Sequence, residues 1–249
     1  MSRITLYRVG VIAAAVLLLE LLCYVRVIDR ITMQPPHQIV RDLFVILASG
    51  KQNAAILKTL SNASIALSLA IVVGILAAVA LHGYRTVRET LDPLFATYYA
   101  VPIFAFYPLL IVLFGLGDAP QIGIGFMLGV VAVIVNTLNG LDRVPRVLRK
   151  TARIQRLGTI ETALKVALPC AAPYVLTGVK FAVAYSLIGI IGAEFIMSRG
   201  GMGYEISFAY NNFDNATMYP LILLILIVSI SINATLSWWE KVLLARRGL

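Results

Sequence analysis

Two carboxylates, Glu20 and Glu194, lie within long apolar stretches of a chain in which only 13% of the residues are charged. A charged group in apolar surroundings costs free energy, so it is retained mostly where it pairs, binds an ion or lines a polar path. Two interpretations of Glu194 stand side by side. It lines a gate or path, or it is a helix-end carboxylate that pairs with Arg199 or bonds to the following glycine turn. Glu20 pairs with Arg26 or meets water between helices.

Other residue types that perform chemistry are scattered. Cys23 and Cys170 lie far apart without a CxxC pattern, and His37 and His82 have no second metal ligand within reach in the sequence. The phosphate-binding pattern GxxxxGK[ST] does not occur, so this chain cannot cradle ATP by that motif. We therefore expect no catalytic residue, no metal ligand and no cofactor bound by the chain itself.

The composition indicates an integral membrane protein. The chain has 249 residues, of which 60% are apolar, and a mean hydropathy of +0.89. An average soluble domain is about 45–50% apolar and about 25% charged, so the few charges here cannot coat a soluble surface. The net charge of +9 fits cytoplasmic loops and lipid headgroups better than a nucleic-acid partner.

Six stretches are long enough to cross the apolar core of a membrane, which takes roughly 20 helical residues. They are Val9 to Val25, Thr59 to Leu81, Pro93 to Gly117, Ala119 to Leu141, Ala171 to Met197 and Ala216 to Trp239. The first stretch has no cleavage site of the signal-peptide type, so we expect it to be retained. The sequence thus predicts an all-α integral membrane protein with one domain over residues 1–249 and six transmembrane helices. Because most Lys and Arg then fall on one side, both termini are predicted to be cytoplasmic.

Two proline residues interrupt the third of these stretches. Pro102 and Pro108 each remove a backbone N–H and free a carbonyl, which a membrane protein tolerates only where protein or water covers the backbone. They predict either a bent helix that lines a path or a simple packing kink. In the fourth stretch, Gly125 and Gly129 form a GxxxG pair that suits close contact between helices. In the fifth, Lys180 lies near enough to the inner end to reach the headgroups.

Two segments between the spans have helical patterns of their own. Pro35–Pro36 opens an amphipathic stretch, which predicts a short helix on the outer surface. The inner segment from Asp142 to Pro169 is the most basic part of the chain, and Pro145 and Gly158 divide it into two short helices. The Lys and Arg side chains of this inner loop either contact anionic lipid headgroups, or the loop binds a cytoplasmic partner.

Several motifs, taken in order, resemble the permease subunit of binding-protein-dependent ABC importers, most closely its nitrate, sulfonate and taurine class. The matching residues are Val101-Pro102, Tyr107-Pro108-Leu109 and Phe114-Gly115-Leu-Gly117, then Leu168-Pro169, Pro173 and Gly178-Val-Lys180, and finally Gly192-Ala-Glu194 and Gly200-Gly-Met-Gly203-Tyr204. The resemblance covers roughly residues 35 to 240. It implies a permease fold of the type I importer class in a bacterial inner membrane.

The resemblance also implies roles for individual residues. In that family the inner loop carries an EAA-type motif, and here Thr151-Ala152-Arg153 stands at that place. Pro169 follows Gly158 by fewer residues than is usual, so either the loop is shortened or the glycine is displaced and Arg156 takes its place. The expected ATPase-coupling residues are Ala152, Arg153, Leu157, Gly158, Leu168 and Pro169. The expected residues of the translocation pathway or gate are Pro102, Pro108, Glu194 and Gly203.

The family further implies partners: a cytoplasmic ABC ATPase dimer that uses the ATP, a second permease chain, expected to be a second copy, and a periplasmic solute-binding protein. The expected load is a small polar or anionic solute such as a sulfonate, taurine or nitrate. Two other functions stay open at this point. A stand-alone, ion-coupled secondary carrier would use Glu20 or Glu194 as its coupling site, and a non-transporting assembly factor would need the docking loop alone.

Overall fold

The computed structural model describes residues 3–29 and 32–245, and within these ranges the chain is built of helices and turns without a β-strand. The first half contains α1 (Arg3–Tyr24), α2 (Pro36–Ser49), α3 (Asn53–Gly83), α4 (Arg85–Thr97), the 3₁₀ helices η1 (Tyr98–Ala100) and η2 (Ile103–Phe106), and α5 (Tyr107–Phe114). The second half contains α6 (Asp118–Asp142), α7 (Arg146–Ile154), α8 (Thr159–Thr162), the π-helical turn η3 (Ala163–Ala167), α9 (Leu168–Met197), α10 (Met202–Asn211) and α11 (Asn215–Ala245).

The predicted all-helical membrane class is confirmed. Among the described residues, four helices are long and apolar enough to span a membrane: Asn53–Gly83, Asp118–Asp142, Thr159–Met197 and Asn215–Val242. A fifth candidate, Thr86–Ala100 with Ile103–Phe114, is bent by 90°, and α1 contributes a shorter apolar helix over Gly10–Tyr24. Each of the six predicted stretches therefore falls on a helix or helix pair, while the count of six crossings stays a prediction.

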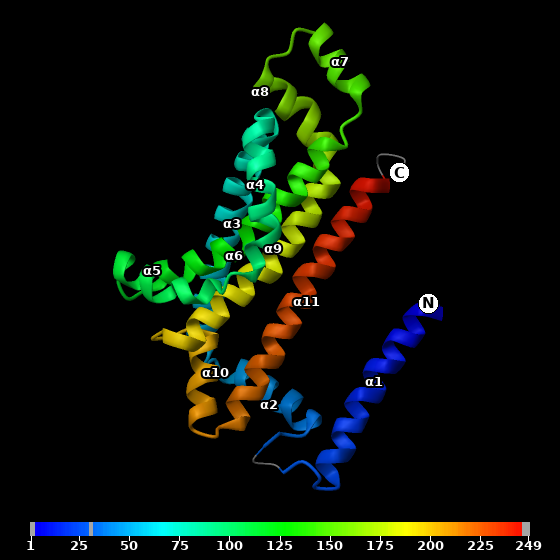
Figure 1. Ribbon diagram of the computed structural model, residues 1–249. Helices are drawn as coiled ribbons and strands as arrows, with labels where there is room; N and C mark the ends of the chain where they lie inside the picture. Colours follow the sequence, from blue (N-terminus) through cyan, green and yellow to red (C-terminus); the bar gives the residue numbers. More distant parts are fainter. Residues whose placement is uncertain (1–2, 30–31, 246–249) are drawn as a thin grey trace.

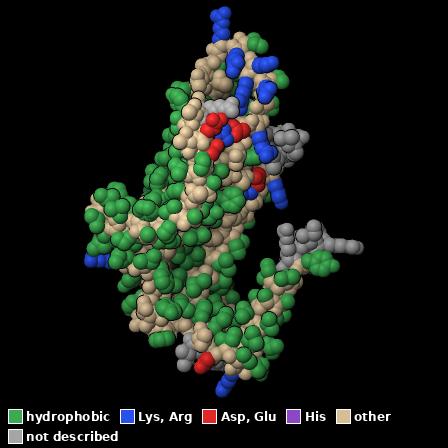
Figure 2. Space-filling view, viewed as in Figure 1, with side chains coloured by type: hydrophobic (Ala, Val, Ile, Leu, Met, Phe, Trp, Pro, Cys, Tyr) green, Lys and Arg blue, Asp and Glu red, His purple; other side chains and the backbone are tan. Residues whose placement is uncertain are grey.

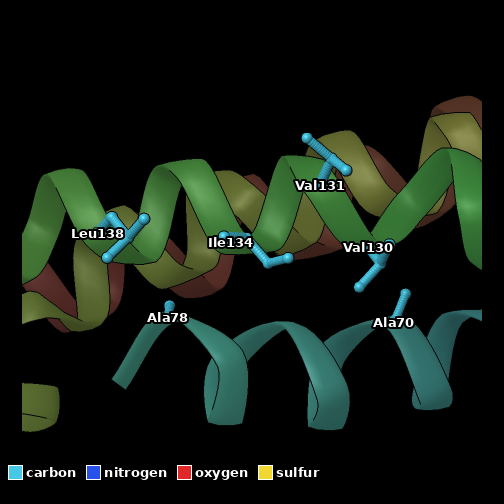
Figure 3. Packing of buried hydrophobic residues seen from close by; sticks show 6 residues of the cluster. All are labelled: Ala70, Ala78, Val130, Val131, Ile134 and Leu138. Atoms are coloured by element: carbon cyan, nitrogen blue, oxygen red, sulfur yellow. The ribbon is translucent and has the colours of Figure 1, made fainter. Parts of the chain in front are cut away.

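Small residues bring α6 against α3 and form the centre of the bundle. Ala70 and Ala78 of α3 face Val130, Ile134 and Leu138 of α6 (Figure 3). All five side chains are buried. Because alanine projects so little, the two backbones approach closely, which is how helices gain dispersion energy in lipid without a hydrophobic driving force.

Glycine residues let α6 and α9 approach each other closely. A Cβ atom added at Gly189 would lie 2.8 Å from the Cα atom of Gly125, and one added at Gly129 would lie 2.6 Å from Oγ of Ser186. Ser186 in turn donates a hydrogen bond to the carbonyl of Gly125 (3.0 Å). The close contact predicted for the Gly125–Gly129 pair is thus confirmed, with α9 as the partner helix.

The first helix lies apart from this bundle. In Figure 1, α1 stands beside α11 with a gap between them, and it is joined to the rest through α2. The predicted outer helix forms as α2, which packs on α11 with Leu43 buried. Nδ1 of His37, on α2, lies 2.5 Å from Oε1 of Glu20, so the partner of Glu20 is His37 and not Arg26.

The two ends of the molecule differ in charge. Lys and Arg side chains gather around α7 at one end, while the flank of the bundle is mostly apolar (Figure 2). Such a distribution fits a cytoplasmic position for α7 and α8. The predicted cytoplasmic position of both chain ends also involves residues 1–2 and 246–249, which lie outside the described residues, and it stays a prediction.

Candidate functional site

A broken helix starts at the end of the bundle that carries the inner loop and bends partway along it. The helix α4 passes into η1, and the chain then turns through Val101 and Pro102 into η2 and α5, so that α5 projects sideways from the bundle (Figure 1). Pro102 immediately precedes η2 at the bend. Pro108 lies in the first turn of α5, where a missing N–H costs nothing. The prediction that both prolines break a helix is therefore correct for Pro102 and wrong for Pro108, which begins one.

The bend leaves its surroundings exposed. The side chains of Tyr99, Val101 and Phe106 are 44%, 42% and 38% exposed. Irregular backbone at membrane depth is tolerated only where it is buried in protein or lines a water-filled cavity. This face of α4 and α5 is consequently the one that another protein chain or an aqueous path must cover.

The second feature is a buried polar knot around Glu194, near the outer end of α9. The Glu194 carboxylate is fully buried and accepts hydrogen bonds from Oγ1 of Thr59, at 2.7 and 2.9 Å, and from the N–H of Gly203 at 3.0 Å. The same Thr59 hydroxyl accepts a hydrogen bond from the N–H of Met202 (2.7 Å). Glu194 and Thr59 thus satisfy the first N–H groups of α10 from two other helices, as an N-cap does from within one chain segment.

Two glycines let the backbone pass over this carboxylate. Gly201 has a φ of +105°, and a Cβ there would lie 2.3 Å from Cδ of Glu194. A Cβ at Gly203 would lie 2.3 Å from the carbonyl oxygen of Ile191. The partners of Glu194 are therefore the glycine turn and Thr59, and not Arg199. This geometry favours the structural interpretation of Glu194, and a role in a gate stays a prediction.

Further polar groups extend the knot toward the outer face. Nδ2 of Asn62 donates to Oε1 of Gln121 (3.3 Å), and Nε2 of Gln121 donates to Oγ of Ser198 (2.9 Å). Lys58 and Asp118 form an ion pair of 2.9 Å beside them. Thr59, Asn62 and Gln121 were not among the site residues predicted from the sequence. A signal was present, since each is a polar residue on a predicted span or at its end.

The basic inner loop forms a compact tip. Ala152 is buried, Leu157 is half-buried, and the N–H of Leu157 donates to the carbonyl of Ala152 (3.0 Å). Arg156 adopts a φ of +54°, the left-handed conformation that favours glycine, whereas Gly158 has an ordinary φ of −65°. This supports the alternative in which the glycine of the motif is displaced and Arg156 takes its place. Ala152 and Leu157 therefore shape the tip from inside, and Arg153 and Gly158 lie on its surface.

Large apolar side chains on this tip point outward. Val147, Ile154 and Ile160 are 71%, 82% and 75% exposed, next to exposed cations such as Arg153. Contiguous exposed apolar groups rimmed by polar residues mark interaction surfaces. Ile154 and Ile160 were not among the contact residues expected from the sequence, because the sequence does not show which face of a short helix is free.

The tip is joined to the bundle by one continuous helical run. Residues Thr159–Met197 pass through α8, η3 and α9 with Leu168 and Pro169 in the first turn of α9, where proline is tolerated. At about 1.5 Å per residue this run is roughly 58 Å long. Deeper along α9, Lys180 forms a short ion pair with Glu240 of α11, to which Thr177 also donates. The described partner of Lys180 is thus Glu240, and the expectation that Lys180 reaches the headgroups stays a prediction.

No group of three or more His, Cys, Asp or Glu side chains that could hold a metal ion occurs in the described part of the chain. Cys23 and Cys170 are both free thiols. The side chains around Glu194 are hydrogen-bonded to one another and join helices, and the tip of the inner loop exposes apolar side chains.

Comparison with known proteins gives a family. Residues 70–248 match the family model described as "Binding-protein-dependent transport system inner membrane component". The nitrate import permease protein NrtB of Synechococcus elongatus is 28% identical over 74% of this chain and 67% of its own length. NrtB of Leptolyngbya laminosa is 31% identical over 59% of this chain, and this match spans about half of the relative (52%).

A third relative carries a different name. The bicarbonate transport system permease protein CmpB of Synechococcus elongatus is 28% identical over 70% of this chain and 63% of its own length. Among solved structures, the inward-facing MetNI methionine ABC transporter aligns with a TM-score of 0.65 and 16% identity, over 77% of this chain and 95% of that one. At this identity the match shows the fold alone.

Proposed function

Since this chain belongs to the family of binding-protein-dependent transport system inner membrane components and is a permease of an ABC importer, we propose that it forms half of a translocation path for a small oxyanion. The relatives named for nitrate and for bicarbonate support a planar, singly charged oxyanion as the load. Sulfonates, including taurine, share only the singly charged oxyanion group with these loads, because their sulfur is tetrahedral and not planar.

The proposed assembly contains two copies of this permease, two ABC ATPase subunits and a periplasmic solute-binding protein in a bacterial inner membrane. The absence of a GxxxxGK[ST] pattern supports a separate ATPase chain, which would use the ATP. The exposed face at the bend supports the second copy, because Val101 and Pro102 need a cover other than lipid. In this proposal Pro102 and Pro108 place the broken helix along the path, and Glu194 and Gly203 close its outer end.

The observation that carries the coupling role is the exposed apolar tip of the inner loop. Ile154 and Ile160 are far more exposed than Ala152 and Leu157, so they form the surface that an ATPase subunit would contact. Movement of the ATPase then passes along the continuous helical run from Thr159 to Met197 and reaches the Glu194 knot at its far end. The carboxylate of Glu194 is held by Thr59 and Gly203, which speaks against its use as an ion-coupling site of a carrier.

The test is co-purification of the ATPase with the chain from native membranes. Ile154→Asp and Ile160→Asp should release the ATPase while the membrane part stays folded, because both side chains lie outside the bundle; Leu157→Asp should release it by disturbing the tip from within. Phe213→Asp, at an equally exposed apolar residue (78%) of the turn between α10 and α11, serves as the control and should retain the ATPase. Recovery of the unaltered chain without any ATPase would overturn the proposal, and full retention by the Ile154 and Ile160 variants would exclude this tip as the dock.

A further inference from the structure

A small pocket lies between α4 and α6, toward the end of the bundle that carries the inner loop. Its volume is about 270 Å³, and Arg88, Asp92 and Asn139 give it a polar side while Phe95, Val135 and Leu138 give it an apolar one. It is smaller than the pockets of roughly 300–1,000 Å³ that hold drug-sized ligands. A pocket of this size suits a small solute together with a few water molecules.

The positive charge of Arg88 at the pocket is already paired with carboxylates. Both terminal nitrogens of Arg88 donate to Asp142, at 2.6 and 2.5 Å, and Nε of Arg88 lies 3.8 Å from Asp92. His82 adds a contact of 3.4 Å to Asp142. A guanidinium flanked by two carboxylates has little attraction left for an anion, so an oxyanion would bind here weakly and leave easily. Weak binding of the solute at the inner end of a path allows its release.

An aromatic cluster follows the pocket residues along the chain, where α4 passes into η1. Arg88, Asp92 and Tyr99 occupy one stripe along α4 and η1, at spacings of four and seven residues. The ring of Tyr99 lies 5.1 Å from that of Tyr185 on α9, and Tyr185 stacks with Phe181 at 6.3 Å. Tyr99 and Phe181 remain 44% and 48% exposed and project from the surface of the bundle, while Tyr185 between them is half-buried. We call these three rings the aromatic collar.

The collar and the pocket lie on the face that lipid cannot cover. The stripe that runs from Arg88 to Tyr99 leads directly to the bend at Val101 and Pro102, whose irregular backbone requires protein or water beside it. Beyond the collar on the same side of α9 lies Ile188, seven residues from Phe181 and 56% exposed.

We infer that the pocket of Arg88, Asp92 and Asn139 is the inner mouth of the translocation path, and that the collar of Tyr99, Phe181 and Tyr185 closes this mouth toward the outer half. This inference rests on the proposed function, because it assigns the pocket to the same path. The class of ligand is a small hydrated polar solute, held transiently. The collar rings act as a constriction: they exclude water and solute until the helices that carry them separate.

The experiment measures the accessibility of single cysteines in the assembled transporter, with Cys23 and Cys170 replaced by Ala. A charged, membrane-impermeant methanethiosulfonate is added to inside-out vesicles. Asn139→Cys should react faster than Val72→Cys by about tenfold or more, since the reactive thiolate forms readily only where water reaches the sulfur. Val72 is the matched control, because it lies mid-helix on α3 and is 56% exposed in the isolated chain.

The collar is tested in the same vesicles. Ile188→Cys should react as slowly as Val72→Cys while the collar is intact, and it should approach the rate of Asn139→Cys when Phe181→Ala or Tyr99→Ala is added. Equal rates for Asn139→Cys and Val72→Cys would overturn the inner mouth. A fast Ile188→Cys with the collar intact, or no gain on removing a ring, would overturn the constriction. Retention of the ATPase, checked in each preparation before labelling, separates a failure of this inference from a failure of the proposed function.

Discussion

Replacing Thr59 by Val tests whether the Glu194 knot holds α3, α9 and α10 together. Valine keeps the shape of the buried threonine but removes its hydroxyl, which donates to Glu194 and accepts from the N–H of Met202. Two buried polar groups then lose a partner at once. Each such loss costs about 1–3 kcal/mol, so Thr59→Val should lower the free energy of unfolding by about 2–6 kcal/mol.

Thr59→Ser is the matched control, because it keeps the hydroxyl and loses only one buried methyl group. That loss should cost about 1 kcal/mol. The measurement is the free energy of unfolding from a titration with denaturing detergent in mixed micelles, followed by helical circular dichroism. Equal stability of the Val and Ser variants would refute the reasoning, since it would show that the hydrogen bonds of the knot contribute nothing beyond packing.

The same chain offers a way to separate the two interpretations of Glu194. Glu194→Gln keeps an oxygen that accepts from Thr59 and Gly203 but places an NH₂ group 2.9 Å from the Thr59 hydroxyl, which can accept only one of its two N–H groups in this buried site. A purely structural Glu194 predicts reduced stability with normal uptake by each assembled transporter. A Glu194 that also takes part in the gate predicts altered uptake at matched amounts of assembled protein.

Two further predictions follow from the packing of α9. Gly189→Ala should destabilise the bundle because the added Cβ would lie 2.8 Å from the Cα atom of Gly125. Gly83→Ala is the control and should be neutral, because a Cβ at Gly83 has no atom within 4 Å. Thermal unfolding of both variants in detergent measures the difference. Lys180→Met should cost about 1–3 kcal/mol because it leaves the half-buried Glu240 without its ion partner. The double variant Lys180→Met with Glu240→Leu should recover most of that loss in the same denaturant titration.

The continuous helical run that contains α9 connects the contacts described above. One end of the helical run lies in the exposed inner tip, and the other end is tied to α3 and α10 through Glu194. Between them, α9 contacts α6 through glycine and α11 through Lys180 and Glu240. The helical run thus connects the tip to the Glu194 knot, and the π-helical turn η3 is an irregular segment between the tip and the span.

The sequence by itself determined the class of the protein, the place of its helices and its family. Long apolar stretches with few charges leave helices in lipid as the only solution, because every backbone group must be hydrogen-bonded within the segment. Other local patterns located α2, the two short helices that follow Pro145 and Gly158 in the inner loop, and the close approach of the Gly125–Gly129 pair to another helix. The sequence also singled out Glu194 as an unusual carboxylate.

Only the tertiary structure decided the partners. For Glu194 the sequence offered Arg199 or the following glycine turn, and the structure selects the turn and adds Thr59 from 135 residues away. For Glu20 the sequence offered the nearby Arg26, whereas the structure supplies His37. It also decided that Pro102 bends the helix while Pro108 starts one, and that Ile154 is exposed where Ala152 is buried. Such facts depend on which helices pack together, and packing is set by the sum of many contacts between distant segments, which local spacing does not contain.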